Sequence, residues 1–67
     1  MLSIEIEREE DGRWIAEVPA LPGVLAYGAT AAEARNKATA LALRVMADRI
    51  EHGEAMPAEA DSLFIAA

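Results

Sequence analysis

Two glutamates with strand spacing are the side chains of this sequence best suited to chemistry. Glu5 and Glu7 are two residues apart, so on a β-strand they share one face at about 6.6 Å along the chain. Paired carboxylates can act as general acid and base or hold a divalent metal ion. Alternating glutamates are also ordinary on a solvent-facing strand, and no third acid converges on this pair. The pair therefore indicates a solvated strand face rather than an active site.

The other reactive side chains do not combine into a catalytic set. His52 is the only histidine, and it falls in the last turn of a predicted helix, where the helix dipole favours a protonated imidazole. Ser3 and Ser62 lack the glycines of a nucleophile elbow. Gly23 and Gly28 lack the flanking pattern and lysine of a phosphate loop. With one histidine and no cysteine, we expect no enzyme activity, no cofactor and no metal site.

The size and charge of the chain favour a protein partner. A chain of 67 residues is a single domain, 1–67, and domains this small often need a second subunit for stability. Twelve acidic and six basic residues give a formal charge of −6, which argues against direct nucleic-acid binding and favours a basic partner. Without a basic groove, Trp14 and Tyr27 are more typical of a core or an interface than of base stacking. No membrane span or signal peptide is recognisable, so we expect a cytoplasmic protein.

Acidic residues cluster in the first part of the chain, where they are either a solvated rim or a docking surface for a cationic protein. Selected for charge and expected exposure, the candidate contacts of a basic partner are Glu5, Glu7, Glu9, Glu10, Asp11, Trp14 and Glu17.

A β-hairpin must position these acids. Residues 2–7 alternate between apolar and polar, which is typical of a half-buried strand. The sequence Glu10-Asp11-Gly12 suits a three-residue loop with glycine in the left-handed conformation. This loop places Ile6 opposite Ala16. A two-residue loop would place Glu17 against Ile6 on the apolar face, and we reject that register because it buries a carboxylate.

A third strand and a long helix follow. Leu21-Pro22-Gly23 predicts a chain reversal before a strand at about 24–27, and Thr30-Ala31-Ala32-Glu33 is a capping box. The helix is expected over residues 31–52, closed by Gly53. Its apolar arc is wider than packing on one sheet requires, which predicts a second covered surface. The expected contacts of a homodimer or higher homo-oligomer are Leu43, Met46, Ile50 and Phe64.

The last part of the chain predicts a short fourth strand, because residues 62–66 are rich in β-forming side chains. The expected fold is therefore α+β, in the order β-β-β-α-β. It consists of a three-stranded antiparallel sheet with one long helix packed on it, followed by the short fourth strand.

Several motifs together resemble the HicB-like antitoxin family over about residues 2–66. The matching positions are Glu10-Asp11-Gly12, Ala16-Glu17-Val18-Pro19, Leu21-Pro22-Gly23, Gly28, Thr30 and Glu33-Ala34. The chain departs from the family pattern at Ala20 and Ala29, where acids are common, and at Val24, where cysteine is common. These departures affect details of the turn and the cap.

The resemblance implies a partial ribonuclease-H-like domain that lacks that enzyme's catalytic acids. It implies an antitoxin of a type II toxin–antitoxin pair, which oligomerises and masks the active surface of a small basic HicA-type toxin that cleaves mRNA. Many members carry a C-terminal DNA-binding domain. Since this sequence ends at Ala67, we expect no such domain and no direct contact with nucleic acid.

Two other functions remain open. One is an orphan homo-oligomeric binding module of the same fold that has no toxin partner. The other, less favoured, is a metal-dependent nuclease of the ribonuclease-H class, because fold alone does not determine function.

Overall fold

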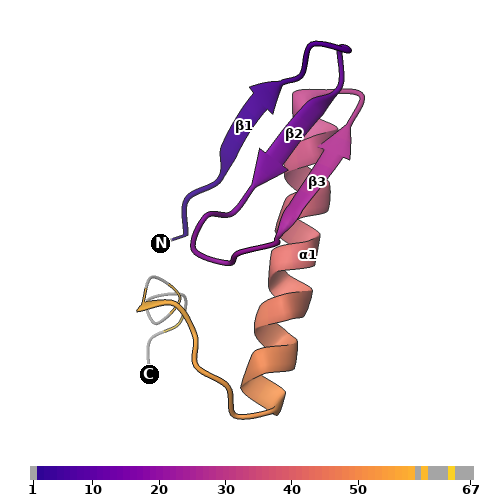
Figure 1. The fold of residues 1–67 in the computed structure, drawn as a ribbon. Helices are drawn as coiled ribbons and strands as arrows, with labels where there is room; N and C mark the ends of the chain where they lie inside the picture. The colour runs from indigo at the N-terminus through magenta and orange to yellow at the C-terminus, as the bar shows by residue number, and fades with distance from the viewer. Residues whose placement is uncertain (1, 59, 61–63, 65–67) are drawn as a thin grey trace.

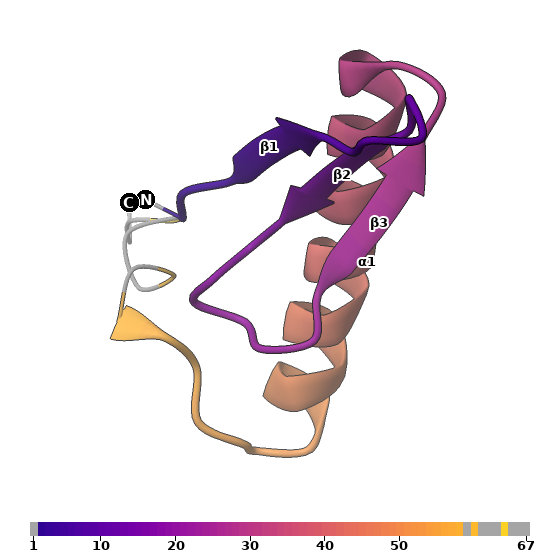
Figure 2. The same ribbon diagram turned by 45° about the horizontal axis from the view of Figure 1, so that its top comes forward.

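A three-stranded antiparallel sheet and one long helix make up the fold. The computed structural model describes residues 2–58, 60 and 64. The strands β1 (Glu5–Arg8), β2 (Trp14–Glu17) and β3 (Leu25–Gly28) lie side by side in that order, and α1 (Ala31–Glu51) packs across one face of the sheet (Figure 1). Viewed from the second direction, α1 lies mainly behind β2 and β3 and continues past the end of the sheet (Figure 2). The predicted α+β class and the strand–strand–strand–helix order are confirmed.

The hairpin has the predicted register. Ile6 is opposite Ala16 and Arg8 is opposite Trp14. The backbone N–H of Glu9 donates to the carbonyl of Arg13 at 2.7 Å, which closes the loop of residues 10–12. Gly12 has a φ of 91°, a conformation that costs glycine little because it has no Cβ.

The connection between β2 and β3 is held by its backbone and by one buried leucine. The N–H groups of Leu21 and Val24 donate to the carbonyls of Val18 and Leu21, each at 3.0 Å. The side chain of Leu21 is fully buried. Gly23 has a φ of 88°, so the predicted chain reversal is present at these residues.

The start of α1 shows the predicted Thr30 cap, whereas the return bond to the Glu33 carboxylate comes from Ala29, one residue before the cap. The hydroxyl of Thr30 accepts a hydrogen bond from the N–H of Glu33 at 3.0 Å, and the Glu33 carboxylate accepts one from the N–H of Ala29 at 3.4 Å. The ammonium of Lys37 lies 3.1 Å from the same carboxylate. Its hydrogen bond, followed by that of Ala29, lowers the pKa of Glu33. A side chain at Gly28 would meet this first turn, because its Cβ would lie 2.5 Å from the nitrogen of Ala34.

The end of α1 is one residue earlier than predicted. The helix ends at Glu51, and His52 is the C-cap. Gly53 has a φ of 68°, and the N–H of Glu54 donates to the carbonyl of Arg49 at 2.8 Å. This bond satisfies a carbonyl that has no partner within the helix.

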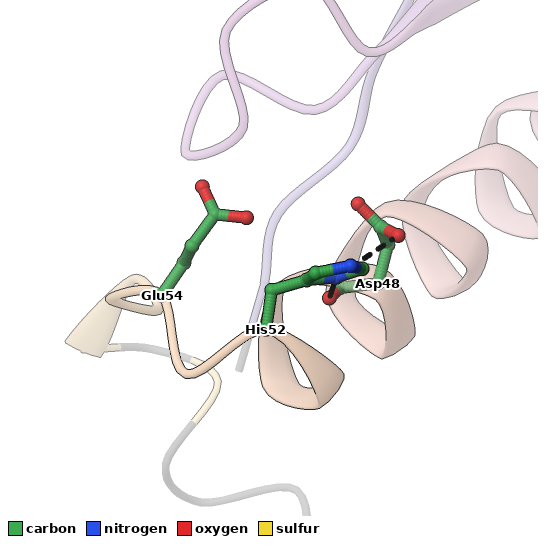
Figure 3. A group of neighbouring side chains, drawn as sticks. All are labelled: Asp48, His52 and Glu54. Carbon is green, nitrogen blue, oxygen red and sulfur yellow. Dashed lines mark hydrogen bonds and ion pairs between the residues drawn. The ribbon is translucent and has the colours of Figure 1, made fainter.

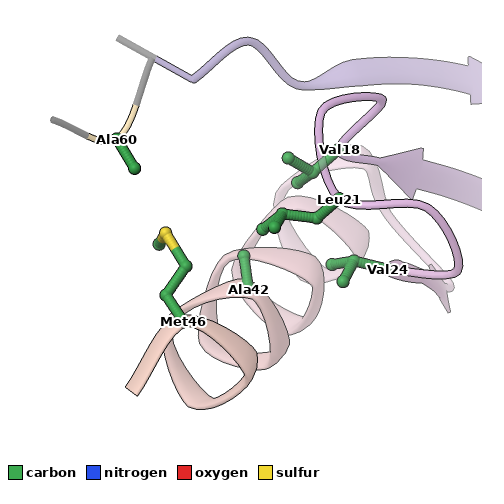
Figure 4. Packing of buried hydrophobic residues seen from close by; sticks show 6 residues of the cluster. All are labelled: Val18, Leu21, Val24, Ala42, Met46 and Ala60. Atoms are coloured by element: carbon green, nitrogen blue, oxygen red, sulfur yellow. The ribbon is translucent and has the colours of Figure 1, made fainter. Parts of the chain in front are cut away.

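Small residues on α1 allow the helix to approach the sheet closely. Ala34 and Ala38 are fully buried against Ala16 of β2. Further along the helix the core widens into a second cluster, which Figure 4 shows from nearby: Val18, Leu21, Val24, Ala42, Met46 and Ala60.

Met46, one of the expected contacts of a homo-oligomer, is instead buried within its own chain. Its side chain is only 5% exposed, and it packs among the core residues of its own chain beside Ala60 (Figure 4). The segment after the helix therefore covers part of the apolar arc that the sequence assigned to a second subunit.

The predicted fourth strand, residues 62–66, lies outside the described residues except for Phe64. Phe64 is not in a strand, and the described ranges contain no fourth strand. In these same ranges, no helix is both long enough and apolar enough to cross a membrane.

Candidate protein-binding surface

The face of the sheet opposite α1 is exposed, and one half of it is acidic while the other half is apolar. Ile6, Ala16 and Ala26 form a cross-strand row packed toward the helix. Since side chains alternate along a strand, the neighbouring residues point to the other face. We call that face the outer face; its members are Glu5, Glu7, Ile15, Glu17, Leu25 and Tyr27.

One half of the outer face is acidic. Glu5 on β1 is directly opposite Glu17 on β2, and Glu7 lies two residues along β1 on the same face. All three are exposed. No ion pair found among the described residues includes any of these three carboxylates. Like charges directly opposite each other destabilise a sheet, so this half of the face attracts a cationic group.

The other half of the outer face is apolar. Leu25 is opposite Glu17, and Tyr27 is opposite Ile15. Leu25 and Tyr27 are 38% and 39% exposed, which is high for large apolar side chains. The guanidinium of Arg13 lies 4.4 Å from the centre of the Tyr27 ring, within the range of a cation–π contact. Charge and apolar area therefore meet on one small surface.

One acid at the hairpin loop, Asp11, forms an ion pair with the neighbouring Arg13. Asp11 accepts a hydrogen bond from the backbone N–H of Arg13 at 3.0 Å and another from its Nε at 2.7 Å. These bonds, with that of the backbone N–H the stronger influence, lower the pKa of Asp11. Glu10 is exposed and Glu9 is half-buried. Of the predicted acidic contacts, Asp11 is therefore the one that forms an ion pair within the described part of the chain.

Trp14 does not share the outer face with the glutamates. It is half-buried and packs against the cluster of Ala16, Ala34 and Ala38 on the helix side of the sheet. The structure thus divides the predicted contacts into three groups. Glu5, Glu7 and Glu17 lie on the outer face, Glu9, Glu10 and Asp11 lie at the end of the hairpin, and Trp14 lies on the opposite face.

Sequence reasoning did not select the apolar members of this surface. Leu25 and Tyr27 lie two residues apart on β3, so their shared face was recognisable from the alternation of residues 24–27. What was missing was the pairing of β3 with β2, which places them beside Glu17 and Ile15.

The predicted self-association residues have different environments. Leu43 and Ile50 are 57% and 64% exposed, and Phe64 is 88% exposed, whereas Met46 is buried as described above. Leu43 also borders a largely apolar groove of about 240 Å³ between α1 and the segment Leu2–Ile4, with Arg35 and Thr39 along its helix side. The contacts of β1 with α1 are the sparsest of the three strands, which explains why the groove opens there.

Comparisons of the chain with protein-family models, with curated proteins and with solved structures found no match.

Proposed function

We propose that this chain is an inhibitory binding protein, the antitoxin of a type II toxin–antitoxin pair. Its partner is a small basic HicA-type toxin that cleaves mRNA, and the chain neutralises the toxin by covering its active surface. The observation that carries the proposal is that Glu5 lies directly opposite Glu17 on the outer face while no ion pair among the described residues includes either carboxylate.

Electrostatics supports a basic partner. A lysine or arginine placed between Glu5 and Glu17 relieves their repulsion and forms charge-assisted hydrogen bonds. The formal charge of −6 also accelerates the encounter with a basic protein at low ionic strength.

The apolar half of the outer face supports binding rather than simple solvation. Specific interfaces combine an apolar centre with charged or polar groups around it, and tyrosine is enriched there. Leu25 and Tyr27 supply such apolar area beside the carboxylates.

Co-expression with a HicA-type toxin tests the proposal. The expected results are co-purification of the two proteins and rescue of growth from the toxin. Reversing both outer-face charges, Glu5→Lys with Glu17→Lys, is expected to weaken binding at least tenfold and abolish rescue. Glu51→Lys with Glu54→Lys, which reverses two exposed charges at the end of α1 and just beyond it, is the matched control and should retain rescue.

The same experiment separates the other functions. If the wild-type chain neither binds nor rescues, the antitoxin proposal is wrong for that toxin class. If the purified chain instead cleaves RNA with Mg²⁺ and Glu5→Gln removes the activity, the chain is a nuclease.

A homo-oligomeric module is the second candidate, and the exposed apolar residues of α1 favour it. Leu43 and Ile50 lie on the same helix, both more than half exposed, and a second copy would remove them from water. Light scattering should then show an oligomer for the wild type and a monomer for Leu43→Asp with Ile50→Asp. A wild-type monomer at high micromolar concentration would contradict self-association.

A further inference from the structure

The end of α1 brings together three side chains that bind metals. Asp48 is in the last turn, His52 is the C-cap, and Glu54 lies two residues beyond it (Figure 3). One ligand atom from each lies within 4.8 Å of the other two, and all three residues are exposed. The count of one histidine and no cysteine predicted no metal site. From this grouping we nevertheless infer that this end of α1 is a binding site for a divalent transition-metal ion of the Zn²⁺ class.

Helical spacing accounts for two of the ligands. Asp48 and His52 are four residues apart, so their side chains are neighbours on the helix surface. The Nδ1 of His52 lies 2.7 Å from the backbone carbonyl oxygen of Asp48 and 3.4 Å from its Oδ1. The imidazole is therefore already held beside the carboxylate, which reduces the entropy lost when both bind one ion.

The helix-ending turn accounts for the third ligand. Gly53 takes a left-handed conformation, and the N–H of Glu54 donates to the carbonyl of Arg49 at 2.8 Å. This turn brings the backbone of Glu54 back to the helix end, so its carboxylate reaches the Asp48–His52 pair. The position of Glu54 thus depends on a backbone motif and not on a flexible tail.

The donor set selects the class of ion. One imidazole nitrogen with two carboxylate oxygens is a three-ligand set that leaves a position for water, as in open zinc sites. Imidazole suits Zn²⁺, Ni²⁺ and Cu²⁺, whereas Mg²⁺ and Ca²⁺ prefer oxygen ligands alone. The partial negative charge of the helix C-terminus adds attraction for a cation.

Titration calorimetry of the tag-free chain with zinc chloride tests the site. We expect one ion per chain and binding at least tenfold tighter than that of Mg²⁺. His52→Gln should weaken Zn²⁺ binding at least tenfold, and Asp48→Asn and Glu54→Gln several-fold each. Glu51→Gln removes one exposed carboxylate from the same helix end without touching the ligand set, so its affinity should stay within twofold of the wild type.

Equal binding by the wild type and His52→Gln would overturn the inference, and so would an equal loss in Glu51→Gln and Glu54→Gln. Amide chemical shifts provide a second measurement that does not depend on variants. Zn²⁺ should shift resonances of residues 48–54. Shifts centred on Glu5, Glu7 and Glu17 would instead show attraction to the acidic sheet and contradict a site on α1.

Discussion

Glu5 on β1 lies directly opposite Glu17 on β2, on the face of the sheet that α1 does not cover. No ion pair in the described part of the chain compensates this contact. A surface with such a repulsion gains more binding free energy from a cationic partner than a neutral surface does, because the partner also removes the repulsion. The pair is therefore both a local weakness of the free chain and the centre of the proposed binding surface.

The first prediction concerns the cost of this repulsion. Glu17→Gln is expected to stabilise the isolated chain by about 0.2–1 kcal/mol, because opposed like charges destabilise a strand pair by that order. The measurement is the urea midpoint at low salt, with the change repeated in a Glu5→Gln background. The stabilisation should shrink in that background, since the opposing charge is already absent. An equal gain in both backgrounds would mean that the two carboxylates do not interact.

The second prediction concerns the leucine that anchors the turn before β3. Leu21 is fully buried, so Leu21→Ala should destabilise the chain by about 3 kcal/mol through lost burial and a cavity. For so small a domain this loss should unfold a large fraction of the protein at 37 °C. Leu43→Ala is the control, because Leu43 is 57% exposed, and its effect should be below about 0.5 kcal/mol. Similar losses from both variants in chemical unfolding would contradict the observed core.

The third prediction concerns the start of α1. Thr30→Ala removes the oxygen that accepts the N–H of Glu33 and should cost about 1 kcal/mol. Thr39→Ala is the matched change inside the helix, where the hydroxyl only donates back to the carbonyl of Arg35. It should be neutral or slightly stabilising, because alanine has the higher helix propensity. Thermal unfolding followed by circular dichroism compares the two, and a greater loss in Thr39→Ala would count against the cap.

The fourth prediction concerns the pH dependence of the hairpin loop. The hydrogen bonds from Arg13 lower the pKa of Asp11 below 3.8, the ordinary value of an aspartate. Because the native state favours the ionised form, the stabilisation is fully present above that value and is lost as the pH falls through the lower native pKa. A carboxyl NMR titration should show Asp11 titrating below the ordinary aspartate value of 3.8. Arg13→Ala removes the side-chain hydrogen bond to Asp11 but keeps the backbone one, so the Asp11 pKa should rise only part of the way toward its ordinary value. A rise to the full ordinary value would mean that the side chain of Arg13 alone causes the shift.

Local chemistry was sufficient to predict the hairpin and the start of the helix, and it predicted the helix end to within one residue. The loop of residues 10–12 determines the pairing of Ile6 with Ala16, because a slip by one residue would turn Glu17 inward. Thr30 and Gly53 act on their own nearest turns. Such interactions span only a few residues, so they can be predicted from the sequence.

The environments of Trp14 and Met46 depended on contacts distant in the chain. Trp14 packs with Ala34 and Ala38 of the helix, on the face that strand alternation gives it together with Ala16, although its selection as a partner contact assumed exposure. Met46 is covered with the help of Ala60, which the helical pattern alone does not reveal. Periodicity shows which residues share a face, but it does not show what covers that face.

The outer face and the group of Asp48, His52 and Glu54 at the end of α1 show the same difference between what the sequence predicts and what packing decides. The amino-acid order by itself determined the strand alternation, the net charge, the helix and its caps, since these follow from short-range geometry and composition. Only the tertiary structure decided that Leu25 and Tyr27 lie beside Glu17 and Ile15, and that Glu54 approaches Asp48 and His52. Strand pairing and the turn after the helix determine these distances, and both depend on how the whole chain packs.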